Sequence, residues 1–119
     1  MIAWVLVALI AGLQLYILVL EMVLWETPRA RAAFGTTAEF AAASKVLAGN
    51  QGLYNGFLAA GLFWSLGLGL AGEGGKVAVF FLLCVLVAGL YGAVTASRRI
   101  LFVQAVPAAL GLGAIWLRW

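Results

Sequence analysis

The sequence contains no histidine, a single cysteine and very few charged residues. The absence of histidine excludes imidazole-based acid–base catalysis and histidine-ligated metal sites. Cys84 is the single cysteine, so no disulfide can form within the chain. Cysteine content therefore does not indicate whether the protein is in an oxidising or a reducing compartment. We therefore expect no metal site, and the sequence identifies no cofactor.

Charged residues make up 9% of the 119 residues, whereas hydrophobic residues make up 66%. A soluble domain carries roughly 25% charged residues and about half apolar ones. The composition excludes a disordered chain, and the seven basic residues are too few and too scattered for a nucleic-acid-binding surface. The sequence predicts an integral membrane protein whose partner is the lipid bilayer and which binds no nucleic acid.

Four apolar segments are each long enough to cross about 30 Å of hydrocarbon as a helix. They cover residues 2–24, 49–71, 77–97 and 100–117. Since each span takes about 20 residues, 119 residues leave no room for a second, soluble domain. We predict one all-α domain over residues 1–119, an antiparallel up-and-down bundle of four transmembrane helices.

The connection between the first two spans, residues 25–48, is the only extended polar stretch, and we expect a loop there. Within it Thr36 and Glu39 have the spacing of a capping box, in which a hydroxyl and a carboxylate satisfy free helix amides. This spacing predicts that the second helix begins near Thr37 and runs to about Ala71.

Glycine and proline mark the other breaks in the pattern. Pro28 disfavours continuation of the first helix. The sequence GEGGK at Gly72–Lys76 predicts a tight turn, which makes the second and third spans antiparallel neighbours. Pro107 predicts a kink in the fourth span, which is tolerated where neighbours satisfy the freed carbonyl.

Basic residues are distributed unevenly between the two ends of this bundle. Arg29, Arg31, Lys45, Arg98 and Arg99 fall in the first and third connections, against Lys76 and Arg118 at the other end. Because basic loops stay in the cytoplasm, loops 25–48 and 98–99 are predicted to be cytoplasmic and both termini to lie outside. We predict a multi-pass protein of the bacterial inner membrane.

Small residues recur at every fourth position in three of the spans. The series are Gly52, Gly56, Ala60; Ala88, Gly92, Ala96; Gly89, Ala93, Ser97; and Ala105, Ala109, Gly113. Small faces let helix backbones approach closely in lipid. They predict packing seams, either within the chain or between copies of it in a homo-oligomer. The simpler alternative is that glycine and alanine are common in membrane helices.

Polar side chains gather at the predicted cytoplasmic end of all four spans. The candidate ligand-binding residues are Glu21, Asn50, Gln51, Tyr54, Asn55, Tyr91, Arg98 and Gln104. Polar groups in hydrocarbon are costly unless they pair or face a cavity, and an intramembrane carboxylate marks a candidate functional site. We expect Glu21 to pair with Arg98 or with an amide of the second span. Together these residues predict a cytoplasm-facing pocket that binds a small molecule or an ion.

Simpler roles exist for each of these residues. Glu21 can be a hydrated interfacial anchor, the amides can join helices, and Tyr91 can belong to the interfacial aromatic belt. Arg98 and Arg99 can mark only the end of a span. The four amide or phenol side chains within NQGLYN, at residues 50–55, exceed what helix packing needs, which favours the pocket.

Three stretches carry a family resemblance: EMVLW at residues 21–25, NQGLYNGFLAAGL at 50–62 and QAVPAALG at 104–111. Together they resemble the small bacterial membrane family catalogued as domain of unknown function 1304. The resemblance covers nearly the whole chain. It implies an integral membrane protein without an assigned activity, so it supports the fold and adds no chemistry.

The chain is also similar to the membrane-associated eicosanoid and glutathione metabolism superfamily. That resemblance implies a trimer of four-helix protomers that binds glutathione between protomers near the cytoplasmic face. Asn50 and Tyr54 match an asparagine and a tyrosine four residues apart. Tyr91 and Arg98 match a tyrosine followed seven residues later by the arginine that polarises the thiol.

The chain departs from that superfamily's pattern at two positions. The acidic residue expected before the first tyrosine is Leu53, and the basic residue expected before the asparagine is Val46, with Lys45 one position away. We therefore predict a binding module of unknown ligand. The alternatives are a glutathione-transferase-like enzyme acting on a lipophilic substrate, in which Arg98 stabilises a thiolate, and a structural membrane scaffold.

Overall fold

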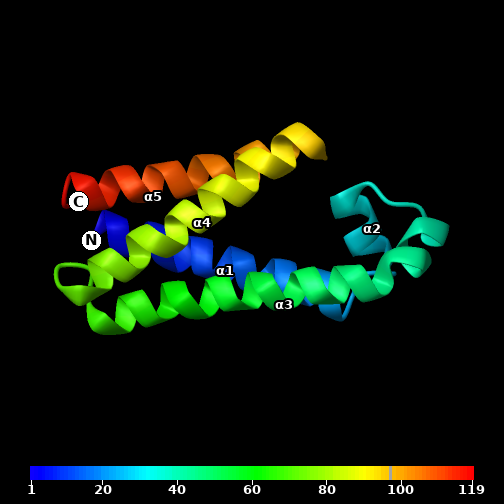
Figure 1. Cartoon of the computed structure of the whole chain (residues 1–119), viewed down its shortest axis with the longest axis horizontal. Coiled ribbons are helices and arrows are strands. Elements are labelled where there is room, and N and C mark those ends of the chain that lie inside the picture. The colour runs from blue at the N-terminus through cyan, green and yellow to red at the C-terminus, as the bar shows by residue number, and fades with distance from the viewer. Residues whose placement is uncertain (97) are drawn as a thin grey trace. The chain divides into compact units, whose positions relative to one another are not determined.

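The computed structural model describes residues 1–96 and 98–119, and within them it contains helices and no strand (Figure 1). The elements are α1 (Ile2–Met22), α2 (Pro28–Phe34), α3 (Ala38–Leu68), α4 (Glu73–Thr95), the π-helical segment η1 (Leu101–Ala105) and α5 (Val106–Trp116). The all-α prediction is confirmed. Ser97, which ends the third predicted span and one small-residue series, lies outside the described residues.

Two helices are long and apolar enough to cross a membrane, judged by length and composition. They are α1, with 21 residues, and α4, with 23. Helices also occupy the other two predicted spans. There, η1 and α5 form a shorter apolar helix, Leu101–Trp116. The helix α3 is longer, with 31 residues, but less apolar, since it carries charged and amide side chains such as Glu39, Lys45 and Asn50.

The chain divides into two compact units, which we describe separately. Unit 1 comprises Met1–Gly12 and Leu58–Trp119. Its buried core draws on α1, α3, α4 and α5 and consists of Val7, Ile10, Ala11, Leu62, Ala78, Leu82, Val85 and Ala108. Ser65 is also fully buried, and its hydroxyl donates to the Leu62 carbonyl at 2.6 Å. The buried serine therefore forms its hydrogen bond within its own helix, and the rest of this core is apolar.

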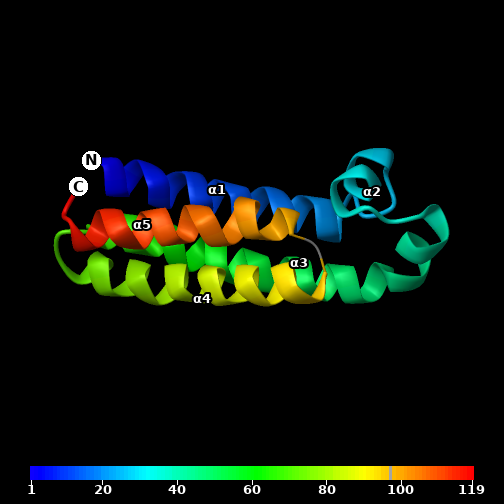
Figure 2. The same ribbon diagram turned by 90° about the horizontal axis from the view of Figure 1, so that it is seen from above.

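Both chain termini lie at the same end of unit 1 as the turn between α3 and α4 (Figure 2). The Met1 ammonium donates to the Trp119 carbonyl oxygen at 2.6 Å, and the Ile2 amide donates to the same oxygen at 2.8 Å. The sequence predicts the termini and this turn on one side of a membrane. The side of the membrane on which they lie stays a prediction.

The turn itself lies earlier than predicted. We expected it at Gly72–Lys76, but α4 already begins at Glu73, and the chain reverses just before it, where Gly69 has a φ of 92°. A Cβ added at Gly74 would collide with the Ser65 carbonyl oxygen. Gly74 therefore allows α4 to start in close contact with α3 instead of making the turn flexible.

The irregular backbone in the fourth predicted span lies before Pro107. The five residues of η1 are π-helical, and Pro107 follows them in the first turn of α5. A Cβ at Gly89 of α4 would lie 2.8 Å from the Ala105 nitrogen. The wider π-helical turn thus coincides with a close backbone contact between α4 and η1.

Unit 2 comprises Leu13–Phe57 and contains a helix, α2, where we predicted a loop. The Thr27 hydroxyl accepts a hydrogen bond from the Ala30 amide at 3.4 Å, and Gly35 ends the helix with a φ of 67°. Threonine at the N-cap, proline in the first turn and glycine after the last turn are typical helix boundaries. They explain why this polar segment is helical.

The N-terminus of α3 is capped by Thr37. Its hydroxyl accepts a hydrogen bond from the Phe40 amide at 3.1 Å, whereas the Thr36 hydroxyl is buried without a partner among the described residues. The predicted start of the helix is confirmed within a residue, but the capping box of Thr36 and Glu39 is wrong by one position. Because α3 begins at Ala38, the residue directly before it supplies the cap.

Candidate functional site

Two glycines of α3 allow close contact with the end of α1 in unit 2. A Cβ at Gly52 would lie 2.5 Å from Met22 Cγ and 3.1 Å from Glu21 Cβ. One at Gly56 would lie 2.5 Å from Leu18 Cδ1. Larger side chains at these positions would push the helices apart, so this part of the predicted small-residue series packs within the chain.

Glu21 and Asn55 meet beside this glycine contact. The Glu21 side chain is buried, at 4% exposure, and its Oε1 accepts a hydrogen bond from Asn55 Nδ2 at 2.6 Å. Asn55 follows Gly52 by three positions, so the two share a face of α3. The glycine that permits close helix packing therefore also brings the amide to the carboxylate. Of the two predicted partners of Glu21, the amide of the second span is the one observed.

Gln14 is a second buried polar residue of α1. It precedes Glu21 by seven residues, about two helical turns, so both lie on one face of the helix. Its side chain is 0% exposed, and neither Nε2 nor Oε1 has a hydrogen-bond partner among the described residues. A buried polar group without a partner costs roughly 1–3 kcal/mol. Gln14 is therefore a buried amide with unused hydrogen-bonding capacity.

The other predicted site residues of unit 2 lie on the exposed side of α3. Asn50 and Gln51 are exposed, and Tyr54 is 59% exposed, with its ring edge-on to Phe57 at 5.7 Å between centroids. The NQGLYN cluster is thus divided between two faces of one helix. Only Asn55 of this cluster is hydrogen-bonded to Glu21 in the described chain.

Three predicted site residues belong to unit 1. Tyr91 lies on α4 with 71% of its surface exposed, and Arg98 is exposed in the connection that follows. Gln104 is half-buried in η1. The structure places these three residues in the unit whose core is apolar.

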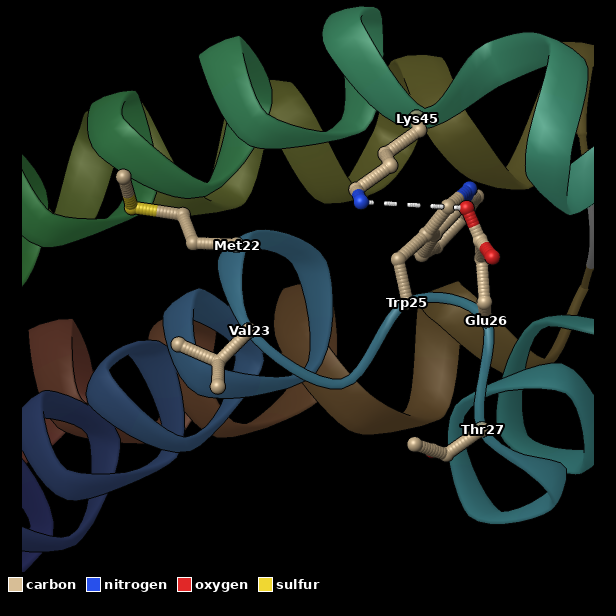
Figure 3. Close-up of a pocket in the computed structure, with 6 residues that line it drawn as sticks. All are labelled: Met22, Val23, Trp25, Glu26, Thr27 and Lys45. Atoms are coloured by element: carbon tan, nitrogen blue, oxygen red, sulfur yellow. Dashed lines mark ion pairs between the residues drawn. The ribbon is translucent and has the colours of Figure 1, made fainter.

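A pocket of about 290 Å³ lies at the C-terminal end of α1 in unit 2 (Figure 3). It is lined by Met22, Val23, Trp25, Glu26, Thr27 and Lys45. The Glu26 side chain extends toward Lys45 of α3, and Nζ lies 3.9 Å from Oε1. None of the predicted site residues lines this pocket. The sequence feature that could have indicated this pocket is the acidic residue directly after Trp25, at the end of an apolar helix.

Trp25 fixes the wall of this pocket. It is 8% exposed, its Nε1 donates to Ser44 Oγ at 3.1 Å, and its ring lies 5.0 Å from the Phe34 ring between centroids. It forms a small core with Ala41 and Ala48. Trp25 and Phe34 therefore pack against each other within the unit.

A hydrogen bond joins Arg29 of α2 to α1. Arg29 Nη1 donates to the Tyr16 hydroxyl at 3.4 Å, and this hydrogen bond raises the pKa of the exposed guanidinium above its ordinary value. Unit 2 thus buries Gln14 and Glu21 among apolar side chains, whereas α2 presents Arg29 on its surface.

A family model described as a protein of unknown function (DUF1304) matches residues 8–116, nearly the whole chain. The chain belongs to the DUF1304 family. This match confirms the resemblance seen in the EMVLW, NQGLYNG and QAVPAALG stretches. No curated protein and no solved structure matches this DUF1304 chain. Its function must therefore be inferred from the arrangement of its own residues.

Proposed function

We propose that this DUF1304 protein is a multi-pass membrane protein that binds a small molecule or an ion at the buried polar groups of unit 2. The apolar helices α1 and α4 support the membrane location. So do large apolar side chains exposed on them, such as Leu9 at 65%, Phe80 at 60% and Val87 at 63%. Extensive apolar surface of this kind is typical of contact with lipid.

The proposed topology has four crossings of the bacterial inner membrane, by α1, α3, α4 and the helix formed by η1 and α5. Loops 25–48 and 98–99 face the cytoplasm, because basic residues concentrate there. Cysteines introduced at Ala32 and Glu73 in a Cys84→Ala background test this orientation. An impermeant maleimide added to the periplasm should label position 73 and leave position 32 unlabelled. The reverse pattern contradicts the orientation.

The observation that carries the binding proposal is the buried Glu21 carboxylate with its single amide donor at 2.6 Å. A buried carboxyl group loses its hydration whether it is charged or protonated, and the charged form costs several kcal/mol even after the surroundings relax. One hydrogen bond to a charged group returns only about 1.5–3 kcal/mol. An ionisable residue kept inside an apolar helix at this cost is typical of a functional site.

The chemistry of the buried groups favours a cationic or hydrogen-bond-donating ligand. Asn55 occupies Oε1 of Glu21, so a small amine or a monovalent cation can bind at the other oxygen. Gln14 offers one further donor group and one acceptor on the same helix face. An anion is disfavoured because the carboxylate would repel it.

Thermal unfolding of the detergent-purified protein tests the proposal. The probes are sodium chloride, potassium chloride, ethylamine, putrescine and reduced glutathione. Glu21→Gln keeps the size of the side chain and its ability to accept from Asn55, and Glu39→Gln removes an exposed acidic residue of α3 as the matched control. We expect at least one probe to raise the Tm of the wild type and of Glu39→Gln, but not of Glu21→Gln. An unchanged Tm with every probe, or an equal response of Glu21→Gln, contradicts the proposal.

The exposed amides of α3 support a homo-oligomer. Asn50 and Gln51 lie on the surface of a helix that we place in the membrane, where lipid offers no hydrogen-bond partner. A second copy of the chain packed on this face would satisfy them. Native mass measurement should show an oligomer that Asn50→Leu with Gln51→Leu weakens. A monomeric wild type would contradict this part of the proposal.

A further inference from the structure

We propose that the pocket at the end of α1 binds the headgroup of a zwitterionic phospholipid that carries a primary amine. The proposal rests on the membrane location proposed above, but not on ligand binding at Glu21. It concerns different residues, those lining the pocket of Figure 3, and we refer to this site as the headgroup pocket.

The charges in the headgroup pocket match a zwitterion. Glu26 and Lys45 stand 3.9 Å apart, with side chains that are 50% and 66% exposed. An exposed ion pair at this separation is weak, so both groups remain available to a ligand. A primary ammonium fits against Glu26 as a charge-assisted donor, and a phosphate fits against Lys45. The acidic and basic side chains are thus complementary to the ammonium and the phosphate of a phosphoethanolamine group.

The apolar side of the headgroup pocket distinguishes a lipid from a soluble zwitterion. Met22 and Val23 are 43% and 72% exposed and continue the apolar surface of α1 up to the charged pair. Because α1 is apolar enough to cross a membrane, its end lies where acyl chains meet headgroups. An amphiphile with its chains along α1 contacts both parts of this site.

The size and the wall residue agree with this ligand. Pockets for small molecules usually have volumes of about 300–1,000 Å³, and this one, at about 290 Å³, suits a headgroup better than a whole lipid. Trp25 lines it, and tryptophan is enriched at the depth of lipid headgroups. The hydrogen bond from its indole to Ser44 holds this wall in place.

Native mass spectrometry of the full chain in detergent tests the proposal. The probes are equal amounts of dioleoyl phosphatidylethanolamine and dioleoyl phosphatidylglycerol, which share acyl chains and phosphate but differ in the amine. We expect the wild type to prefer phosphatidylethanolamine by about threefold to fivefold, the size expected for one exposed charge contact. Glu26→Gln should bind the two lipids equally, and Lys45→Gln should bind less of both.

Glu73→Gln and Lys76→Gln are the matched controls, because they remove an exposed acid and base from α4. Both should keep the wild-type preference. Equal binding of the two lipids by the wild type, or an unchanged preference in Glu26→Gln, overturns the proposal. Displacement of lipid by an equal concentration of soluble glycerophosphoethanolamine overturns the assignment to a membrane lipid.

Glu21→Gln separates this proposal from the binding site proposed for Glu21. It should retain the lipid preference of the wild type, because Glu21 does not line the headgroup pocket. A lost preference in this variant would overturn the independence of the two sites. If no small molecule binds at Glu21, the ratio of bound phosphatidylethanolamine to phosphatidylglycerol still tests the headgroup pocket by itself.

Discussion

The two units of the chain are both helical, but their interiors differ. In unit 1 the buried side chains of four helices are aliphatic, and the buried serine bonds to a carbonyl one turn away. In unit 2 the helix α1 buries Gln14 and Glu21, and Glu21 finds its partner on another helix. Close contacts at glycine occur in both, at Gly89 in unit 1 and at Gly52 in unit 2.

This difference separates the requirements of folding from those of function. An apolar core with close contacts at glycine packs the helices of unit 1. The buried carboxylate and amides of unit 2 add cost without improving that packing. Under the proposed function, the ligand binds in unit 2 and unit 1 provides structural support.

The largest loss of stability in either unit should come from removing the hydrogen-bond partner of Glu21. Asn55→Leu leaves a buried carboxylate without its donor and should destabilise the fold by about 2–4 kcal/mol. Glu39→Gln, which changes an exposed side chain of the same helix, should have little effect on stability. Reversible unfolding in mixed detergent measures both values.

A double variant sharpens the same prediction. Glu21→Leu combined with Asn55→Leu replaces the polar pair by an apolar one and should recover most of the stability lost in Asn55→Leu. If the double variant is no more stable than Asn55→Leu alone, the carboxylate is not the source of the cost. Burial of Glu21 in unit 2 would then carry no energetic cost that the apolar core of unit 1 lacks.

The next largest effect should occur in unit 1. A Cβ at Gly89 would lie 2.8 Å from a backbone nitrogen of η1, which can yield only if the segment moves. Gly89→Ala should therefore destabilise by about 1–3 kcal/mol. Gly113→Ala has open space around the new Cβ and should be neutral or stabilising by up to about 1 kcal/mol. Equal effects of the two substitutions would show that α4 and η1 are not in close contact.

The close contact at Gly52 in unit 2 should tolerate an added methyl group better than the contact at Gly89. A Cβ at Gly52 would meet Met22 Cγ, which belongs to a flexible side chain, before it meets Glu21 Cβ at 3.1 Å. Gly52→Ala should cost about 1–2 kcal/mol, while Gly49→Ala, with no neighbour within 4 Å, should cost nothing. Thermal unfolding of the pair provides the comparison. A larger loss at Gly52 than at Gly89 would reverse the predicted order.

The smallest effect concerns the helix cap of unit 2. Thr37→Ala removes the hydroxyl that accepts from the Phe40 amide and should cost about 1 kcal/mol. Thr36→Ala removes a buried hydroxyl without a partner in the described chain and should be neutral or slightly stabilising. The same unfolding assay measures both, and a greater loss for Thr36→Ala would restore the capping box predicted from sequence.

Much of the fold could be predicted because helix periodicity and boundary residues are local signals. The start of α3 near Thr37 depends on one hydroxyl and its neighbouring amides. The helix α2 could also have been found, since Thr27, Pro28 and Gly35 are ordinary boundary residues. The turn before α4 was misplaced because glycine permits both a turn and close helix packing, and only the neighbouring Ser65 carbonyl decides between them at Gly74.

The candidate site was less predictable because the rotation of a helix about its axis depends on what packs against it. The amide-rich cluster was visible in the sequence, but the close contact at Gly52 determines that Asn55, and not Asn50, faces Glu21. The pairing of Glu26 with Lys45 joins residues far apart along the chain. No local pattern indicates such a pair.

A binding isotherm tests the central claim, that Glu21 holds a ligand, most directly. The amine or cation probe that raises the Tm most is titrated by calorimetry into the wild type, Glu21→Gln and Glu39→Gln. We predict saturable binding with the same Kd for the wild type and Glu39→Gln, and binding weakened by about tenfold or more in Glu21→Gln. Equal Kd values for all three proteins would contradict the account.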